Sequence, residues 1–233
     1  MQENSIHILC TRPLSESLLE EVRQQDILID TLSFIETEPI LSIEVQQEIE
    51  QAFVRMAAVV FTSMNAVEAV ANYMDEKPDW RIYCIGTATQ KLVKEYFGEA
   101  AIAGTASEAT ELAELIVEDE PGEEIIFFCG DQRREELPSI LESNGLELTE
   151  IVVYQTIAVP HKINKAYNGI LFFSPSAVDS FFTGNKVNGS TLLFAIGNTT
   201  ARTIKKYSAN KVIVSDEPGK ENLVEKMIEY FRG

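Results

Sequence analysis

The sequence predicts an α/β fold in two domains, each with a parallel sheet that is flanked by helices. Short apolar runs alternate with helical patterns along the 233 residues, and this alternation is typical of parallel strands joined by helices. The chain also repeats itself. One part returns without a gap at an offset of 111 residues, and the remainder repeats more faintly at an offset near 119. The repeats indicate a duplicated α/β unit, and the length is sufficient for two domains with separate cores.

Strands are predicted where a short apolar run ends at a turn, and helices where apolar residues recur every three or four positions. The predicted strands are Ile6–Cys10, Ala58–Phe61, Ile82–Ile85, Ala100–Ala103, Ile125–Cys129, Ile170–Phe173, Leu192–Ile196 and Lys211–Val214. The predicted helices are Ser15–Gln24, Ile43–Arg55, Ala66–Met74, Ala88–Phe97, Glu108–Glu118, Arg134–Ser143, Ala177–Phe182, Thr200–Tyr207 and Glu221–Phe231. Two helices carry end signals, since Ser107 is expected to cap the helix that begins at Glu108, and Gly145 follows the helix that ends near Ser143.

The stronger repeat lies mainly in the turns that follow strands. The segment VVFTSMNAV at 59–67 returns as ILFFSPSAV at 170–178, and CIGTAT at 84–89 returns as AIGNTT at 195–200. In each copy an apolar run stops at a turn of small, hydroxyl-bearing or glycine residues before a helix begins. Open α/β sheets bind ligands at such turns, at the carboxyl ends of their strands. Four turns in two equivalent pairs indicate a ligand held between two related half-sites.

Two segments interrupt the alternation of strands and helices. Thr31–Ile40 and Leu146–Pro160 are β-prone, longer than a core strand, and closed by proline, so we predict extended connectors with few contacts to either core. If both cross the same gap, residues 1–35 and 158–233 form one discontinuous domain and residues 36–157 the other, with the crossings near 31–40 and 150–160. Two consecutive domains that meet near residue 120, with Glu118–Glu124 as their linker, are also compatible with the repeats.

The composition narrows the class of partner. Lys and Arg number 19 against 37 Asp and Glu, and the net charge of -18 disfavours nucleic acid and anionic membranes. A small-molecule substrate is therefore expected, and the protein is expected to be a monomer. A cytoplasmic location is expected because no apolar stretch approaches a membrane span and no secretory leader is present. The three cysteines stand alone in apolar runs and should be buried and reduced. The two histidines lack ligand-like companions, so no metal site is expected.

The usual catalytic signatures are missing, including glycine-rich phosphate loops, nucleophile elbows and a Ser-His-Asp set. The turns instead offer backbone N–H groups and hydroxyls at helix N-termini, which bind carboxylates or phosphates without a formal positive charge. Any single hydroxyl could merely cap its helix. The candidate binding residues in these turns are Thr62, Ser63, Asn65, Gly86, Thr87, Thr89, Ser174, Ser176, Ala177, Gly197, Asn198, Thr199 and Thr200.

Further candidates follow two other strands. Arg12, after the first strand, could pair with an anion or lie free on the surface, and Gly130 stands at the equivalent point of the second copy. Arg133 and Arg134 are interpreted as the solvated first turn of a helix. Tyr154 lies in the second connector, where a domain-spanning strand would bring its phenol to a cleft, although a core position is the default for such a residue.

An ordered set of segments resembles the uroporphyrinogen-III synthase family of tetrapyrrole and heme biosynthesis. The set comprises FTSMNAV, IGTAT, the FFCG…RREEL…VVYQT run, FFSPSAV and AIGNTTA, and it spans nearly the whole chain. The resemblance implies two α/β domains joined by a two-stranded connector, the first domain discontinuous, with the active site in the cleft between them. It also implies a hydro-lyase that needs no cofactor and closes the linear tetrapyrrole hydroxymethylbilane with inversion of the last ring and loss of water.

The implied substrate carries eight carboxylates, which the donors in the turns would bind. By position, Ser63, Thr89, Ser174 and Thr200 match hydroxyl residues of the family, and Tyr154 matches its tyrosine. Tyr154 is the predicted catalytic residue, as the best-placed proton donor for the departing hydroxyl. The family often has proline where this chain has Met64 and Asn198, so those two turns are expected to be looser.

Two other functions fit the same residues. A non-catalytic module that closes around a polycarboxylate or a tetrapyrrole would use the same cleft and the same donors, although it would ordinarily carry a secretory leader. A sensory domain descended from the synthase fold would act through other proteins, and the lack of a fused output segment counts against it.

Overall fold

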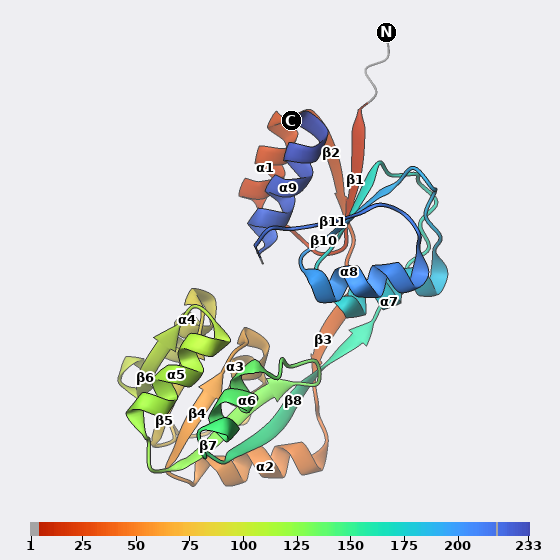
Figure 1. The fold of residues 1–233 in the computed structure, drawn as a ribbon. Coiled ribbons are helices and arrows are strands. Elements are labelled where there is room, and N and C mark those ends of the chain that lie inside the picture. Colours follow the sequence, from red (N-terminus) through yellow and green to blue (C-terminus); the bar gives the residue numbers. More distant parts are fainter. Residues whose placement is uncertain (1–4, 218) are drawn as a thin grey trace. The chain divides into compact units, whose positions relative to one another are not determined.

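The computed structural model describes residues 5–217 and 219–233 and divides the chain into two compact units (Figure 1). Unit 1 consists of Met1–Glu36 and Ile157–Gly233, and unit 2 of Thr37–Thr156. Unit 2 is therefore inserted between the two parts of unit 1. Each unit has its own mainly parallel sheet and its own helices, which confirms the predicted α/β class.

Unit 1 has a five-stranded sheet in which all neighbouring strands run parallel. In the order β11-β10-β9-β1-β2, the first strand pairs on one side with β2 and on the other with β9. The two parts of unit 1 thus share one sheet. Its strands are β1 (Ile6–Cys10), β2 (Ile27–Thr31), β9 (Gly169–Phe172), β10 (Leu192–Ala195) and β11 (Val212–Val214).

Helices cover both faces of this sheet, because successive side chains of a strand point to opposite faces. Ile8 and Cys10 of β1 pack in one cluster with residues of α1 (Glu16–Gln24) and α9 (Lys220–Arg232). Leu9 packs in a second cluster with residues of α7 (Pro175–Gly184) and α8 (Asn198–Tyr207). Because α7, α8 and α9 follow β9, β10 and β11 in the chain, these three helices begin at the carboxyl edge of the sheet.

Unit 2 has a six-stranded sheet in the order β3-β8-β7-β4-β5-β6. Five of these strands, β8-β7-β4-β5-β6, repeat the order β2-β1-β9-β10-β11 of unit 1, and their neighbours are likewise parallel. The two predicted repeats are thus confirmed as one shared topology. The strands are β3 (Ile35–Pro39), β4 (Ala57–Phe61), β5 (Trp80–Ile85), β6 (Ile102–Ala106), β7 (Glu124–Gly130) and β8 (Leu148–Ala158).

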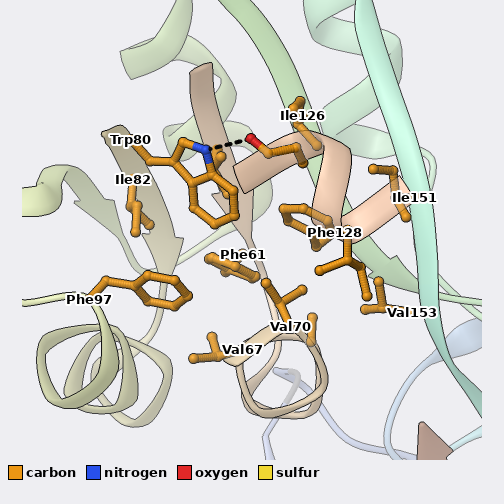
Figure 2. Packing of buried hydrophobic residues seen from close by; sticks show 14 of the residues in the cluster. Phe61, Val67, Val70, Trp80, Ile82, Phe97, Ile126, Phe128, Ile151 and Val153 are labelled. Carbon is orange, nitrogen blue, oxygen red and sulfur yellow. Dashed lines mark hydrogen bonds between the residues drawn. The ribbon is translucent and has the colours of Figure 1, made fainter. Parts of the chain in front are cut away.

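The sheet of unit 2 is also covered on both faces. Figure 2 shows one face, where Phe61, Trp80, Phe97 and Phe128 lie together among aliphatic residues. This face packs against α2 (Ile43–Phe53), α3 (Met64–Ala71) and α4 (Thr87–Tyr96), and the opposite face packs against α5 (Ala109–Asp119) and α6 (Glu136–Ser143). A short 3₁₀ turn, Glu99–Ala101, precedes β6.

The predicted connectors have more structure than expected. Thr31–Ile40 contains the end of β2 and the whole of β3. Most of Leu146–Pro160 forms β8, which pairs with β7 and buries Ile151 and Val153 in the core of unit 2. The expectation of few core contacts was wrong for this segment, because its alternate apolar residues supply a buried face.

Several helix starts differ from the prediction. The helices α3, α7 and α8 begin two residues earlier than predicted, at Met64, Pro175 and Asn198. The helix predicted from Arg134 begins at Glu136, since the preceding residues form a turn in which Arg133 N–H donates to the Gly130 carbonyl. Ser107 does not cap α5. Its hydroxyl and its N–H both donate to the carboxylate of Glu111, and Glu108 occupies the N-cap position.

Candidate functional site

Three turns of unit 2 lie at one edge of its sheet, because β7, β4 and β5 are parallel neighbours. After β4, Ser63 caps α3 by accepting a hydrogen bond from Asn65 N–H at 3.2 Å, and Thr62 beside it is half-buried. After β5, Gly86 precedes α4 with a φ of 81°, and Thr87 is exposed. The first N–H groups of both helices lack acceptors within their helices, so this edge offers donors to an anion.

Unit 1 presents the equivalent edge, formed by the turns after β1, β9 and β10. Ser174 caps α7 by accepting a hydrogen bond from Ala177 N–H at 3.1 Å, and its oxygen lies 3.0 Å from that of Ser176. Gly197 precedes α8, whose first residues Asn198 and Thr199 are exposed. A Cβ placed on Gly86 or Gly197 would meet no atom within 4 Å, so a ligand has room to approach the backbone in both units.

Four of the predicted binding residues are buried. Thr89 and Thr200 are 5% and 2% exposed, and they are buried in the first turns of α4 and α8. Ala177 is buried and contributes its N–H to the Ser174 cap, while Gly130 is buried at the end of β7. These four residues pack beneath the turns, and they have little exposed side-chain surface for contact with a ligand.

Tyr154 lies beside Gly130 in the register of β7 and β8, next to an irregularity in the pairing. Its ring covers the glycine, since a Cβ on Gly130 would come within 2.3 Å of the ring. The ring also packs against the core shown in Figure 2, and the residue is half-buried. Among the described residues, no group forms a hydrogen bond with the phenol. The ring of Tyr154 therefore has apolar surroundings, and its hydroxyl, at the carboxyl edge of the sheet of unit 2, has no hydrogen-bond partner among the described residues.

Asp131, which is not among the predicted site residues, fixes the position of the segment that carries Tyr154. Its N–H donates to the Tyr154 carbonyl at 3.1 Å, and its carboxylate accepts from the N–H of Thr156 at 2.8 Å. Arg133 forms ion pairs with Glu150 and Glu135, so its guanidinium is not free for a ligand. The Gly-Asp sequence after a strand was the available signal for Asp131, but the partner of its carboxylate, Thr156, lies 25 residues away.

Two cationic residues, Arg12 and Lys220, lie near the carboxyl end of β1 in unit 1. Arg12 is exposed, and no ion pair with it exists among the described residues. The turn is fixed because the Thr11 hydroxyl donates to the Leu171 carbonyl at 2.8 Å and the Cys10 thiol donates to the Arg12 carbonyl at 2.9 Å. Lys220, the first residue of α9, lies close enough for its charge to act on Cys10. The prediction placed the start of this helix one residue later and missed Lys220.

The three cysteines are free and buried, as predicted. Burial raises the pKa of the Cys10 thiol to about 12 and the pKa values of the Cys84 and Cys129 thiols to about 11. They are therefore protonated near neutral pH and are poor nucleophiles. Within residues 5–217 and 219–233, no cluster of His, Cys, Asp and Glu could hold a metal ion, and no helix is long and apolar enough to cross a membrane.

The chain resembles known proteins over most of its length. Residues 16–225 match the family model described as Uroporphyrinogen-III synthase HemD. The uroporphyrinogen-III synthase of Saccharomyces cerevisiae is 25% identical over 178 residues, which cover 65% of this chain and 64% of the yeast protein, less than two thirds of its length.

Solved structures share the fold. The uroporphyrinogen-III synthetase of Helicobacter pylori is 16% identical with a TM-score of 0.67, over 97% of this chain and 99% of that one. A mutant uroporphyrinogen III synthase of Thermus thermophilus is 14% identical with a TM-score of 0.58, over 97% and 98% of the two chains.

Proposed function

Because the chain belongs to the uroporphyrinogen-III synthase family, we propose that it closes hydroxymethylbilane to uroporphyrinogen III. In this reaction the last ring is inverted and water is lost, with no cofactor taking part. The observation that supports the proposal is the pair of matching carboxyl edges, one in each unit, where helix N-termini stand beside open glycine backbone at Gly86 and Gly197.

The donors at these edges suit a substrate with eight carboxylates. Backbone N–H groups at a helix N-terminus bind an anion through hydrogen bonds and the helix dipole, without a buried charge. The Ser63 and Ser174 turns supply one such terminus in each unit, and the turns after β5 and β10 supply another. Outward-facing acidic residues, such as Glu111, Glu114 and Glu118 on α5, account for part of the net charge of -18.

The main task of the protein is to control the shape of the substrate. The linear tetrapyrrole is intrinsically reactive, and direct closure without inversion competes with the proposed reaction. Holding its carboxylates at fixed positions in both units brings the reacting carbons together in the inverted geometry, which is catalysis by proximity and orientation. We propose that the two units enclose the substrate between their carboxyl edges, and that the protein acts as a cytoplasmic monomer.

Tyr154 is proposed to assist the departure of the substrate hydroxyl. Its phenol would donate a hydrogen bond or a proton to the departing oxygen, so that water leaves as the cation forms. Two features support this role: the apolar seat of the ring on Gly130, and the absence of a hydrogen-bond partner for the hydroxyl among the described residues.

The test is to supply freshly generated hydroxymethylbilane and to resolve the porphyrin isomers after oxidation. Isomer III is expected in excess of the spontaneous isomer I, in proportion to the amount of protein. Isomer I alone, together with saturable binding of the tetrapyrrole, would replace the enzyme by the non-catalytic binding module.

A further inference from the structure

Lys220 is the first residue of α9, and this helix begins near the carboxyl end of β1. The helix follows β11, and its residues Leu223 and Val224 pack in one cluster with Ile8 and Cys10. This packing holds the first turn of α9 beside the turn that carries Arg12. Arg12 follows the last residue of β1 by two positions, and Lys220 lies in the same turn of α9 as Leu223, so both cations are near the carboxyl end of β1. The charges of both act on the Cys10 thiol.

The position is unfavourable for a cation in the free protein. Burial lowers the pKa of the Lys220 ammonium, and repulsion from Arg12 lowers it further. Lys220 is also the first residue of a helix, where the helix dipole disfavours positive charge. Glu221, the acidic residue that acts on Lys220, is exposed and forms no ion pair with it among the described residues.

No other lysine of the described residues is in this situation. Lys226 is also half-buried, but it pairs with Asp216 at 2.6 Å. The remaining lysines are exposed to water, which solvates their charge. Within residues 5–217 and 219–233, Lys220 is the half-buried lysine that has no acidic partner. A desolvated charge of this kind is expected to find a partner in the functional state.

We propose that Lys220 and Arg12 form a two-cation seat for one carboxylate of the substrate. This proposal rests on the proposed function and adds a substrate-binding residue to it. The carboxylate would lie between the ammonium and the guanidinium and neutralise their mutual repulsion. The seat distinguishes unit 1 from unit 2, because the equivalent position after β7 carries Asp131, which is engaged with Thr156.

The experiment compares Lys220→Met with Lys220→Arg, using Lys186→Met as a control. Lys186 is an exposed lysine of the same unit, in the loop after α7 and hence at the opposite edge of the sheet. Lys220→Met should raise KM for hydroxymethylbilane and Kd for uroporphyrin III about tenfold, the effect of one lost charge-assisted hydrogen bond. Its kcat should stay within about twofold, since no reacting atom is touched. Lys220→Arg should keep most of the affinity, and Lys186→Met should equal the wild type.

The melting temperature gives a second reading. Lys220→Met should keep or raise Tm of the free protein, because it removes an unfavourable charge, and it should reduce the Tm increase caused by uroporphyrin. Unchanged KM and Kd in Lys220→Met, or a lowered Tm with normal affinity, would overturn the seat. A wild type that produces only isomer I would instead overturn the proposed function, while the binding comparison would still test Lys220. If Lys220→Met does not fold, Lys220→Gln makes the same comparison with a polar side chain.

Discussion

The phenol of Tyr154 differs from the other tyrosine hydroxyls whose contacts are defined. Tyr83 donates to Asp119 at 2.8 Å, and Tyr167 donates to Asp30 at 2.8 Å, so both hydroxyls serve the fold. Among the residues that the structure describes, the hydroxyl of Tyr154 forms no such bond, and the ring packs against Gly130 and the neighbouring core. Removing the Tyr154 oxygen should therefore cost the free protein little stability.

Tyr154→Phe tests the proposed chemical role. If the phenol assists departure of the hydroxyl, single-turnover rates should fall about 10- to 1000-fold, the range for loss of one positioned donor. Affinity for uroporphyrin III and the melting temperature should stay close to those of the wild type. Tyr83→Phe is the matched control, expected to lower Tm through the bond lost by Asp119 and to leave turnover unchanged. An unaltered rate in folded Tyr154→Phe would leave conformational control as the whole of catalysis.

The positions of individual residues in the fold were predictable where the signal was local. Arg12 and Tyr154 follow or belong to recognisable strand patterns, and the structure places both at carboxyl edges. Lys220 was not predictable, because its isolation depends on the packing of α9 against a strand more than 200 residues away. No spacing in the sequence reveals which lysine lacks a carboxylate.

At the level of elements, the two glycine turns are equivalent in position but differ in backbone conformation. Gly86 has a φ of 81°, in the region that favours glycine, whereas Gly197 has a φ of -172°, which any residue adopts. Both have open space where a side chain would be placed. A side chain at Gly197 should therefore affect only the approach of a ligand. A side chain at Gly86 should affect both the approach of a ligand and the backbone conformation.

Valine substitutions make this comparison. Gly197→Val should leave the melting temperature unchanged but raise KM about tenfold, a loss of about 1.4 kcal/mol of binding, because the side chain fills the approach to the backbone. Gly86→Val should raise KM similarly and also destabilise the protein by about 1 kcal/mol or more through backbone strain. Gly189, which has equally open space in the loop before β10, is the control, and Gly189→Val should change neither quantity. An unchanged KM in Gly197→Val would argue against backbone recognition at that turn.

Elements were predictable where apolar runs were long and continuous. The buried strands β4 and β7 lie close to their predicted bounds. Edge strand β2 was missed because ILIDT is mostly exposed and follows a tight turn at Asp26, whose φ is 52°. β6 begins two residues later than predicted, because Glu99–Ala101 form a 3₁₀ turn, and it ends three residues later, at Ala106. It continues through Gly104, where a Cβ would collide with Leu115 and Tyr83, so glycine there serves close packing and does not end the strand.

For the whole molecule, the chain passes from one unit to the other at only two points, next to Glu36 and next to Thr156. A ligand that binds both carboxyl edges would gain its full set of contacts only when the units close around it, so the bound state should be more compact. Small-angle scattering should show a smaller radius of gyration when uroporphyrin III is added to saturation. The Gly86→Val/Gly197→Val double variant, which should bind about a hundredfold more weakly, should show no change at the same ligand concentration. An equal radius in the free and saturated wild type would favour a preformed site.

The insertion of unit 2 within unit 1 also sets the order in which the protein can fold during synthesis. The ribosome makes β1, α1 and β2 first, but β1 needs β9 on its other side, and β9 begins only at Gly169. Unit 2 is a continuous segment and has all its strands by Ala158. Unit 2 can therefore fold before β9 has been translated, while the edge of β1 that pairs with β9 is still unpaired. An unpaired apolar edge invites aggregation. The interval between translation of β2 and of β9 is the stage at which a chaperone would protect this chain most effectively.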